Sequence, residues 1–162
     1  MSGKICCFTG HRKIEEKYVF TLNETLKRRL EELVEAGYTV FKAGGAVGFD
    51  TMVALNVLLL KKKYGFVRLE LYLPCRDQTK KWGSAEKKIY DFILNNADSI
   101  TYVSEIYTRD CMFKRNRALV DQSDLCIAFC NTSSTSGGSV YPVNYAKEKG
   151  VRCENLFEIV RK

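Results

Sequence analysis

Short apolar runs alternate with longer amphipathic segments along the whole chain, and this alternation restricts the fold more than any other feature. The runs at 4–8, 38–42, 67–73, 99–103, 125–129 and 152–156 have the length and composition of β-strands. Helical spacing of apolar residues marks the segments 18–36, 50–63, 84–97, 109–121 and 140–149. Strands that alternate with crossover helices are typical of a parallel sheet covered on both faces. We therefore expect a single Rossmann-like α/β domain over residues 1–162, with a mostly parallel sheet between two helical layers.

The apolar positions of the helical segments predict which faces are buried. In segment 18–36 these positions are Val19, Leu22, Leu26, Leu30 and Leu33. In segment 84–97 they are Ile89, Phe92 and Ile93. Segment 50–63 is apolar nearly all round, so we expect one side on the sheet and the other on a second surface. Contact between copies of the chain would supply that second surface, and we therefore expect a homo-oligomer.

The composition limits the classes of partner. Apolar residues make up 46% of the chain and charged residues 28%, as in soluble globular proteins. The formal net charge of +7 favours anionic partners. The basic residues of the chain lie in short groups, and solvated helix faces explain these groups better than a nucleic-acid footprint does. No apolar run approaches the roughly 20 residues that span a bilayer, so we expect no membrane partner.

The cysteines point to packing rather than to metal or disulfide chemistry. The chain has 7 cysteines but no CxxC motif, and His11 is its single histidine, so we expect no metal site and no cofactor. Cys6, Cys7, Cys126 and Cys130 sit in or beside apolar strands, where a free thiol packs as a small hydrophobe. Reduced thiols and the absence of a signal peptide predict a cytoplasmic protein.

Polar turns follow four of the predicted strands, at Thr9–Arg12, Gly44–Asp50, Pro74–Trp82 and Asn131–Ser139. The carboxyl ends of parallel strands lie at one edge of the sheet, and ligands bind there where the strand order reverses. We therefore expect these turns to converge on one ligand site. From the first turn, Thr9, Gly10 and Arg12 are candidate contacts, with Arg12 either a phosphate clamp or a surface arginine.

Two of these turns resemble phosphate-binding loops. Each leads from a strand into a helix, whose N-terminal amides attract anions. The first, GGAVGFD, contributes Gly44, Gly45, Gly48 and Asp50 as candidates. It lacks the GxGxxG spacing, and a tight turn explains its glycines equally well; Asp50 either accepts ribose hydroxyls or caps the helix. The second loop contributes Ser136, Gly137, Gly138 and Ser139, with Ser139 at the expected N-cap.

Three further residues are candidates for polar or stacking contacts. Arg115 and Arg117 lie on nearly opposite faces of a regular helix. Arg115 shares a face with Met112 and Leu119, so we expect it to point inward as the ligand contact, with Arg117 outside. Trp82 either stacks on a base or packs against the body of the protein. His11 has no evident partner for a catalytic triad, and we expect a hydrogen-bonded structural role.

The motifs CFTGHR, GGAVGFD, PC-x-x-Q-x-x-x-W, CMFKRNRALVDQSD and SGGSVYPVNYA occur in this order along nearly the whole chain. Together they resemble the YpsA-type proteins (DUF1273) of the SLOG superfamily, which also contains the LOG phosphoribohydrolases and the DNA-uptake protein DprA. This resemblance implies a Rossmann-like fold that binds nucleotides or nucleotide-derived ligands such as relatives of ADP-ribose.

The similarity to the LOG enzymes is more distant. It implies that Arg115 corresponds to their catalytic arginine, because their M-x-x-R-K helix segment is similar to Met112–Asp124. Their PGG-x-GT-x-x-E loop is similar to Gly137–Asn144, but the position of its glutamate holds Asn144 or Pro142, depending on the alignment. Neither residue supplies a carboxylate, and Glu148 lies one helical turn further on.

Three functions from different classes follow. The first is a nucleotide-binding module that acts as a sensor, carrier or sequestering protein. The second is a hydrolase of N-glycosidic bonds, in which Arg115 is catalytic and Asp50 or Glu148 replaces the missing glutamate. The third is DprA-like nucleic-acid binding, driven by the positive charge.

Overall fold

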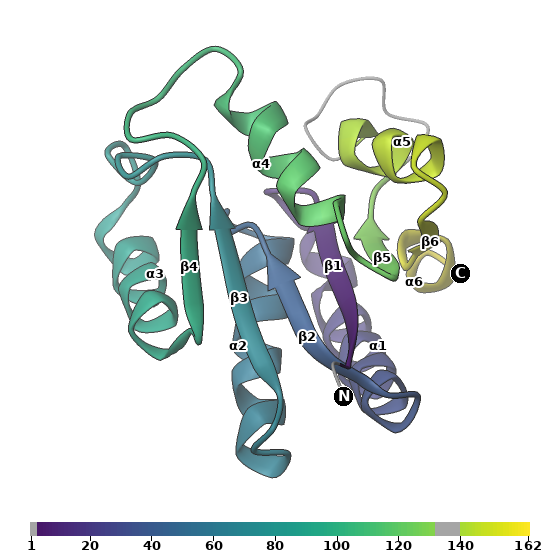
Figure 1. Ribbon diagram of the computed structural model, residues 1–162. Helices are drawn as coiled ribbons and strands as arrows, with labels where there is room; N and C mark the ends of the chain where they lie inside the picture. Colours follow the sequence, from purple (N-terminus) through teal and green to yellow (C-terminus); the bar gives the residue numbers. More distant parts are fainter. Residues whose placement is uncertain (1–2, 132–139) are drawn as a thin grey trace.

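The computed structural model describes residues 3–131 and 140–162, and side chains from residue 142 onward in the second range (Figure 1). A parallel sheet of six strands organises it, in the order β4-β3-β2-β1-β5-β6. The strands are β1 (Lys4–Gly10), β2 (Tyr38–Ala43), β3 (Arg68–Leu73), β4 (Ser99–Tyr102), β5 (Leu125–Phe129) and β6 (Arg152–Asn155). From β1 the chain builds outward through β2, β3 and β4, and then returns to place β5 on the other side of β1. The strand order therefore reverses between β1 and β5.

The helices cover both faces of this sheet, as the sequence predicted. They are α1 (Glu16–Glu35), α2 (Phe49–Lys63), α3 (Ser84–Asn96), α4 (Cys111–Val120), α5 (Val140–Glu148) and α6 (Phe157–Val160). In Figure 1, α4 and α5 lie in front of the sheet, and α1 and α2 lie behind it. Helix α3 packs beside α2, and the short helix α6, which the sequence pattern did not predict, packs on α1.

The main core lies between the sheet and the layer of α1, α2 and α3. Leu22, Leu26, Leu30 and Leu33 of α1 are buried there as predicted. Val19 is 41% exposed, because Tyr18 rather than Val19 packs against the core from the first turn of the helix. The expected face of α3 was partly wrong. Tyr90 and Ile93 are buried, whereas Ile89 and Phe92 are exposed, because α3 lies at the β4 edge and covers little of the sheet.

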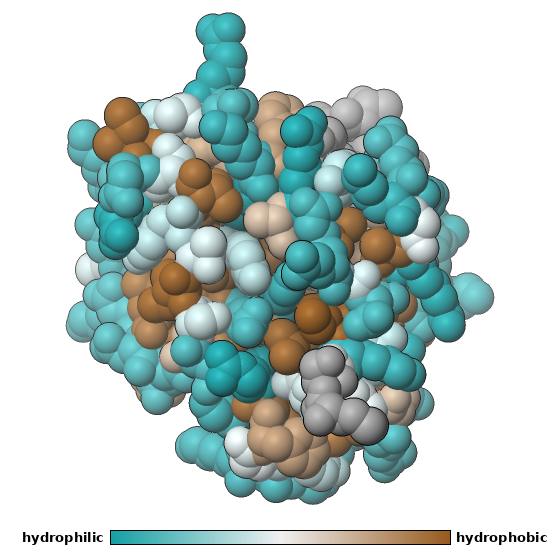
Figure 2. Space-filling view, viewed as in Figure 1, coloured by the Kyte–Doolittle hydropathy of each residue, from teal (hydrophilic) through white to brown (hydrophobic). Residues whose placement is uncertain are grey.

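Helix α2 is apolar on most sides because it contacts three neighbours. Val53, Ala54 and Val57 are buried in the core, and α1 and α3 pack on its two flanks. Leu59 is nevertheless 55% exposed. Among the described residues no helix is long and apolar enough to cross a membrane. On the face shown in Figure 2, hydrophilic side chains predominate and the apolar ones lie in separate patches.

Candidate functional site

A cavity of about 390 Å³ opens at the carboxyl edge of the sheet, beside the point where the strand order reverses. Three parts of the chain line it: the end of β1 with the residues after it, the β2–α2 loop with the first turn of α2, and the inner face of α4. The lining residues are Thr9, Gly10, His11, Arg12, Lys13, Ala46, Asp50, Met112, Arg115, Asn116 and Leu119. Five candidates from the sequence, Thr9, Gly10, Arg12, Asp50 and Arg115, thus meet at one cavity.

Arg115 is turned into the protein, as its helical position predicted. Its side chain is only 7% exposed. Nη1 donates a hydrogen bond to the carbonyl oxygen of Gly44 at 2.6 Å, and Nε donates to Oδ1 of Asn116 at 2.9 Å. Arg117 is exposed, with its guanidinium over the ring of Tyr145. Burial lowers the pKa of Arg115 and the charge of Asp50 raises it, so the guanidinium is a fixed cation in a poorly solvated place.

Asp50 carries the most unusual polar atom of the cavity. It lies in the first turn of α2 and is 5% exposed. Oδ2 accepts a hydrogen bond from the amide of Ala46 at 3.2 Å, whereas Oδ1 is buried and has no hydrogen-bond partner among the described residues. Burial raises the pKa of Asp50 to about 6, against the opposing charge of Arg115. A buried acceptor without a donor costs about 1–3 kcal/mol, which a donor in the cavity would recover.

Gly44 makes room for both charged groups. A methyl group there would come within 2.5 Å of Arg115 Nη1 and 2.8 Å of Asp50 Oδ2. Gly48 has φ +80°, and a side chain on it would meet the carbonyl oxygen of Arg12 at 2.2 Å. The amide of Phe49, the first of α2, already donates to the carbonyl of His11 at 3.0 Å. Because Gly44 and Gly48 have no side chains, the β2–α2 loop can pack closely against the rest of the protein. The amide of Phe49 is already used in a hydrogen bond within the chain.

His11 has the structural role that the sequence predicted. Its backbone amide donates to the carbonyl of Phe129, and its Nε2 accepts a hydrogen bond from the amide of Asn131 at 2.8 Å. Because Nε2 accepts, the ring is neutral, and burial lowers the pKa of His11 in the same sense. His11 thereby joins the ends of β1 and β5. Arg12 and Lys13 are exposed at the cavity and add positive charge to it.

Among the described candidates, Trp82 and Gly45 do not line this cavity. Trp82 packs edge-on against Tyr90, with ring centroids 5.2 Å apart, and Gly45 lies against Leu73. Ser136, Gly137, Gly138 and Ser139 lie outside the described residues. Sequence reasoning missed the contribution of Asn116, which is 5% exposed and holds Arg115 in place. The signal was present, because Asn116 shares a helix face with Met112, Leu119 and Val120.

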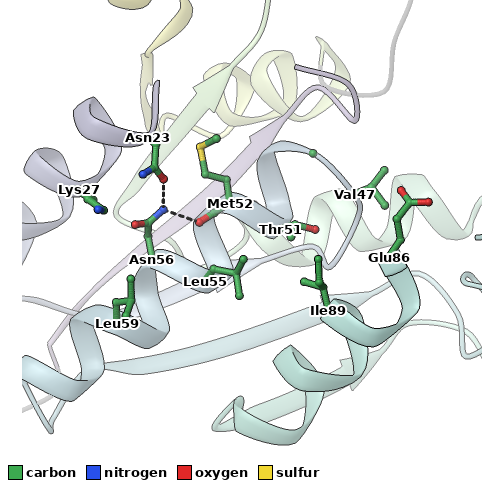
Figure 3. Close-up of a pocket in the computed structure, with 11 residues that line it drawn as sticks. Asn23, Lys27, Val47, Thr51, Met52, Leu55, Asn56, Leu59, Glu86 and Ile89 are labelled. Carbon is green, nitrogen blue, oxygen red and sulfur yellow. Dashed lines mark hydrogen bonds between the residues drawn. The ribbon is translucent and has the colours of Figure 1, made fainter. Parts of the chain in front are cut away.

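A second hollow, of about 410 Å³, lies between α1, α2 and α3 (Figure 3). The side-chain amide of Asn56 lies at the bottom of this hollow, where Nδ2 donates hydrogen bonds to Asn23 Oδ1 at 2.8 Å and to the carbonyl oxygen of Met52 at 2.9 Å. Leu55, Leu59 and Ile89 form apolar walls. Because the buried amide of Asn56 is satisfied within the protein, this hollow lacks the unpaired polar group found beside Arg115. We refer to it as the α1–α3 groove.

The protein-family model YpsA, whose description is "YspA SLOG family", matches residues 6–160. The chain belongs to this family. The YpsA-family chain is 31% identical over 141 residues to the SPbeta prophage-derived protein YoqJ of Bacillus subtilis (strain 168), covering 78% of this chain and 81% of YoqJ. It is 26% identical over 156 residues to a UPF0398 protein of Bacillus anthracis (strain A0248), covering 91% of this chain and 84% of the relative.

Two solved structures share the fold. The DNA processing protein A of Helicobacter pylori, described with a single-stranded DNA binding mode, superposes with a TM-score of 0.64 at 20% identity. The match covers 94% of this YpsA-family chain and 64% of the H. pylori protein. This chain therefore spans less than two thirds of the length of the H. pylori protein. The structural-genomics target TM1055 has a TM-score of 0.57 at 15% identity, covering 93% of this chain and 72% of that one.

Proposed function

We propose that this YpsA-family protein binds a nucleotide or nucleotide-derived ligand in the cavity between β1, α2 and α4, as a sensor, carrier or sequestering protein. The observation that carries the proposal is the pair of buried groups on the cavity wall. Asp50 Oδ1 is an acceptor without a donor, and Arg115 is a buried cation beside it. A ligand with both hydroxyl donors and anionic oxygens satisfies the two together.

The cavity lining has a cationic part and an acidic part, which suit two different parts of a nucleotide. Arg115, with the exposed Arg12 and Lys13, suits phosphate oxygens, because guanidinium groups bind them with paired hydrogen bonds. Asp50 suits ribose hydroxyls, which donate hydrogen bonds to a carboxylate. The volume of about 390 Å³ lies in the usual range for small-ligand sites and fits a mononucleotide or part of ADP-ribose or NAD.

The second candidate is hydrolysis of an N-glycosidic bond in such a ligand. The pKa of Asp50 near 6 favours it, because a carboxyl group with a raised pKa exchanges protons near neutral pH. Arg115 would then stabilise the anionic part of the substrate. Glu148, the other carboxylate considered, is exposed on α5. Asp50 is therefore the better candidate for acid–base chemistry.

The third candidate is nucleic-acid binding. The H. pylori structural relative is described as binding single-stranded DNA, at an identity that establishes only the common fold. On this chain, Tyr107 and Phe113 are exposed near the basic residues Arg109 and Lys114, and bases stack on such aromatic rings. Steep weakening with salt would distinguish this mode from a buried small-molecule site.

Thermal unfolding with AMP, NAD and ADP-ribose tests the proposal. A ligand at about 100 times its dissociation constant stabilises the folded state by about 2.7 kcal/mol, a readily measured shift. We expect at least one of these compounds to stabilise the wild type, and Asp50→Asn to reduce the shift. Mass spectrometry of the compounds after incubation separates binding from hydrolysis. If no compound stabilises the protein and none co-purifies with it, the proposal is wrong.

We also propose that the protein self-associates through the α1–α3 groove and acts in the cytoplasm. Leu59 and Ile89 leave apolar surface exposed at this groove, and Lys27 and Glu86 place opposite charges on its rim (Figure 3). Under two-fold symmetry the same surface meets itself, so Lys27 of one copy can face Glu86 of the other. Analytical ultracentrifugation tests this assembly.

A further inference from the structure

Three cysteines form a row across adjacent strands on the sheet face that α4 and α5 cover. Cys7 of β1 pairs with Cys126 of β5, and Cys126 pairs with Cys153 of β6. Paired residues of parallel strands point to the same face, and the three side chains share one cluster with Leu119 and Ala146. Cys126 is the central member, with one cysteine beside it on each neighbouring strand. We call Cys7, Cys126 and Cys153 the thiol row.

The members of the thiol row differ in reactivity. The interaction of the central thiol with the other two raises the pKa of Cys126 and lowers the pKa values of Cys153 and Cys7. The charge of Lys147 also lowers the pKa of Cys153. Cys7 and Cys126 are buried, whereas Cys153 is half-buried on the edge strand β6. Cys153 therefore combines a lowered pKa with partial access from solvent, and both properties favour oxidation.

We propose that Cys153 and Cys126 are a redox modification site, in which a hydroperoxide oxidises Cys153 and Cys126 then closes a disulfide. In the first step the Cys153 thiolate attacks the peroxide, the O–O bond breaks, and Cys153 becomes a sulfenic acid while the peroxide leaves as an alcohol or water. In the second step the Cys126 sulfur attacks the sulfenic sulfur, the S–O bond breaks, and the hydroxyl leaves as water with the Cys126 proton. The two thiols lose two electrons, and the peroxide gains them.

The strand geometry favours Cys126–Cys153 over Cys7–Cys126 as the linked pair. Neighbouring strands lie about 4.8 Å apart, within the roughly 4.4–6.8 Å between α-carbons that a disulfide bridges. β6 is a four-residue edge strand with a single strand neighbour, so it can adjust to the new bond. β1 and β5 are both internal strands. The edge position of β6 therefore distinguishes the Cys126–Cys153 pair from the Cys7–Cys126 pair.

Treatment with one equivalent of hydrogen peroxide, followed by non-reducing digestion and peptide mass spectrometry, tests the proposal. We expect a Cys126–Cys153 linked peptide as the main product, and its loss after dithiothreitol. Cys153→Ser should give no linked product, and Cys126→Ser should leave a Cys153 sulfenic acid that dimedone captures. Cys75→Ser, at a buried cysteine outside the row, should behave as the wild type.

Three outcomes would overturn the proposal: a Cys7–Cys126 link as the main product, oxidation of Cys153 without a cross-link in the wild type, or equal oxidation of all cysteines. The wild-type peptide map decides between these results by itself, so the test does not depend on the folding of the serine variants. Circular dichroism of those variants shows whether their results refer to folded protein.

Discussion

Arg115 and Asp50 both lie against the α-carbon of Gly44, where a methyl group would come within 2.5 Å of Arg115 Nη1 and 2.8 Å of Asp50 Oδ2. The guanidinium is fixed there by the Gly44 carbonyl, and the carboxylate by the amide of Ala46. The β2–α2 loop thus holds a cation and an anion side by side without filling the space next to them. A ligand that meets both groups would find them already oriented.

Gly44→Ala should disrupt this arrangement. The added methyl group forces Arg115 or Asp50 to move, and overpacking of this kind costs about 1–3 kcal/mol of unfolding free energy. We expect that loss in urea unfolding, together with loss of nucleotide-induced thermal stabilisation. Gly65→Ala is the matched control, because a methyl group at Gly65 meets nothing within 4 Å. Equal effects of the two substitutions would show that Gly44 is not close-packed.

Arg115→Ala should abolish stabilisation by nucleotides while the protein still folds. It removes the proposed phosphate contact and leaves the Gly44 carbonyl without its donor, at a cost of about 1–3 kcal/mol. Arg117→Ala removes the same charge from the exposed side of α4 and should retain the ligand shift. Thermal unfolding with and without ligand measures both variants. An unchanged shift in Arg115→Ala would remove this residue from the site.

The buried carboxyl group of Asp50 should make stability depend on pH. Its pKa is about 6 in the folded protein, against about 3.9 in an unfolded chain. Between these values the folded state holds a proton that the unfolded state has lost, so stability falls as pH rises from about 4 to about 6. A difference of about 2 pH units corresponds to about 3 kcal/mol.

Asp50→Asn lacks this titration. The free energy of unfolding of the variant, minus that of the wild type, should therefore rise from about pH 4 to about pH 6 and stay constant above. Urea unfolding at intervals of pH measures this difference. Asp91→Asn, at an exposed position of α3, controls for the loss of one carboxylate and should follow the wild-type profile. If Asp50→Asn and the wild type give parallel profiles, Asp50 is not a buried acid.

The sequence predicted the architecture because strand and helix patterns are local. Alternating segments indicated the parallel sheet, and the spacing of Met112, Arg115 and Leu119 predicted that Arg115 points inward. The partners of Arg115 were not predictable in the same way. Gly44 lies 71 residues away in sequence, and only the packing of α4 over the end of β2 brings it within 2.6 Å of the guanidinium.

Glycine patterns showed where the backbone is crowded but not what crowds it. Gly10 lies against the ring of Phe49, and Gly48 lies against the carbonyl of Arg12; both are contacts within the protein. Close approach to a ligand and close approach to another part of the chain select the same residue. Apolar spacing likewise predicted the α1 face from Leu22 to Leu33, but it could not locate the edge of the sheet, beyond which Phe92 is exposed.

Leu59→Glu should weaken self-association if the α1–α3 groove is the contact between copies. The substitution places a charge on the apolar wall of the groove, where a second copy would have to bury it. Because Leu59 is 55% exposed, the isolated chain should keep its stability. Lys62→Glu, at an exposed position of the same helix, introduces the same acid outside the groove. Sedimentation should show a lower association state for Leu59→Glu and an unchanged one for Lys62→Glu; a monomeric wild type, or equal behaviour of the two variants, would rule out this interface.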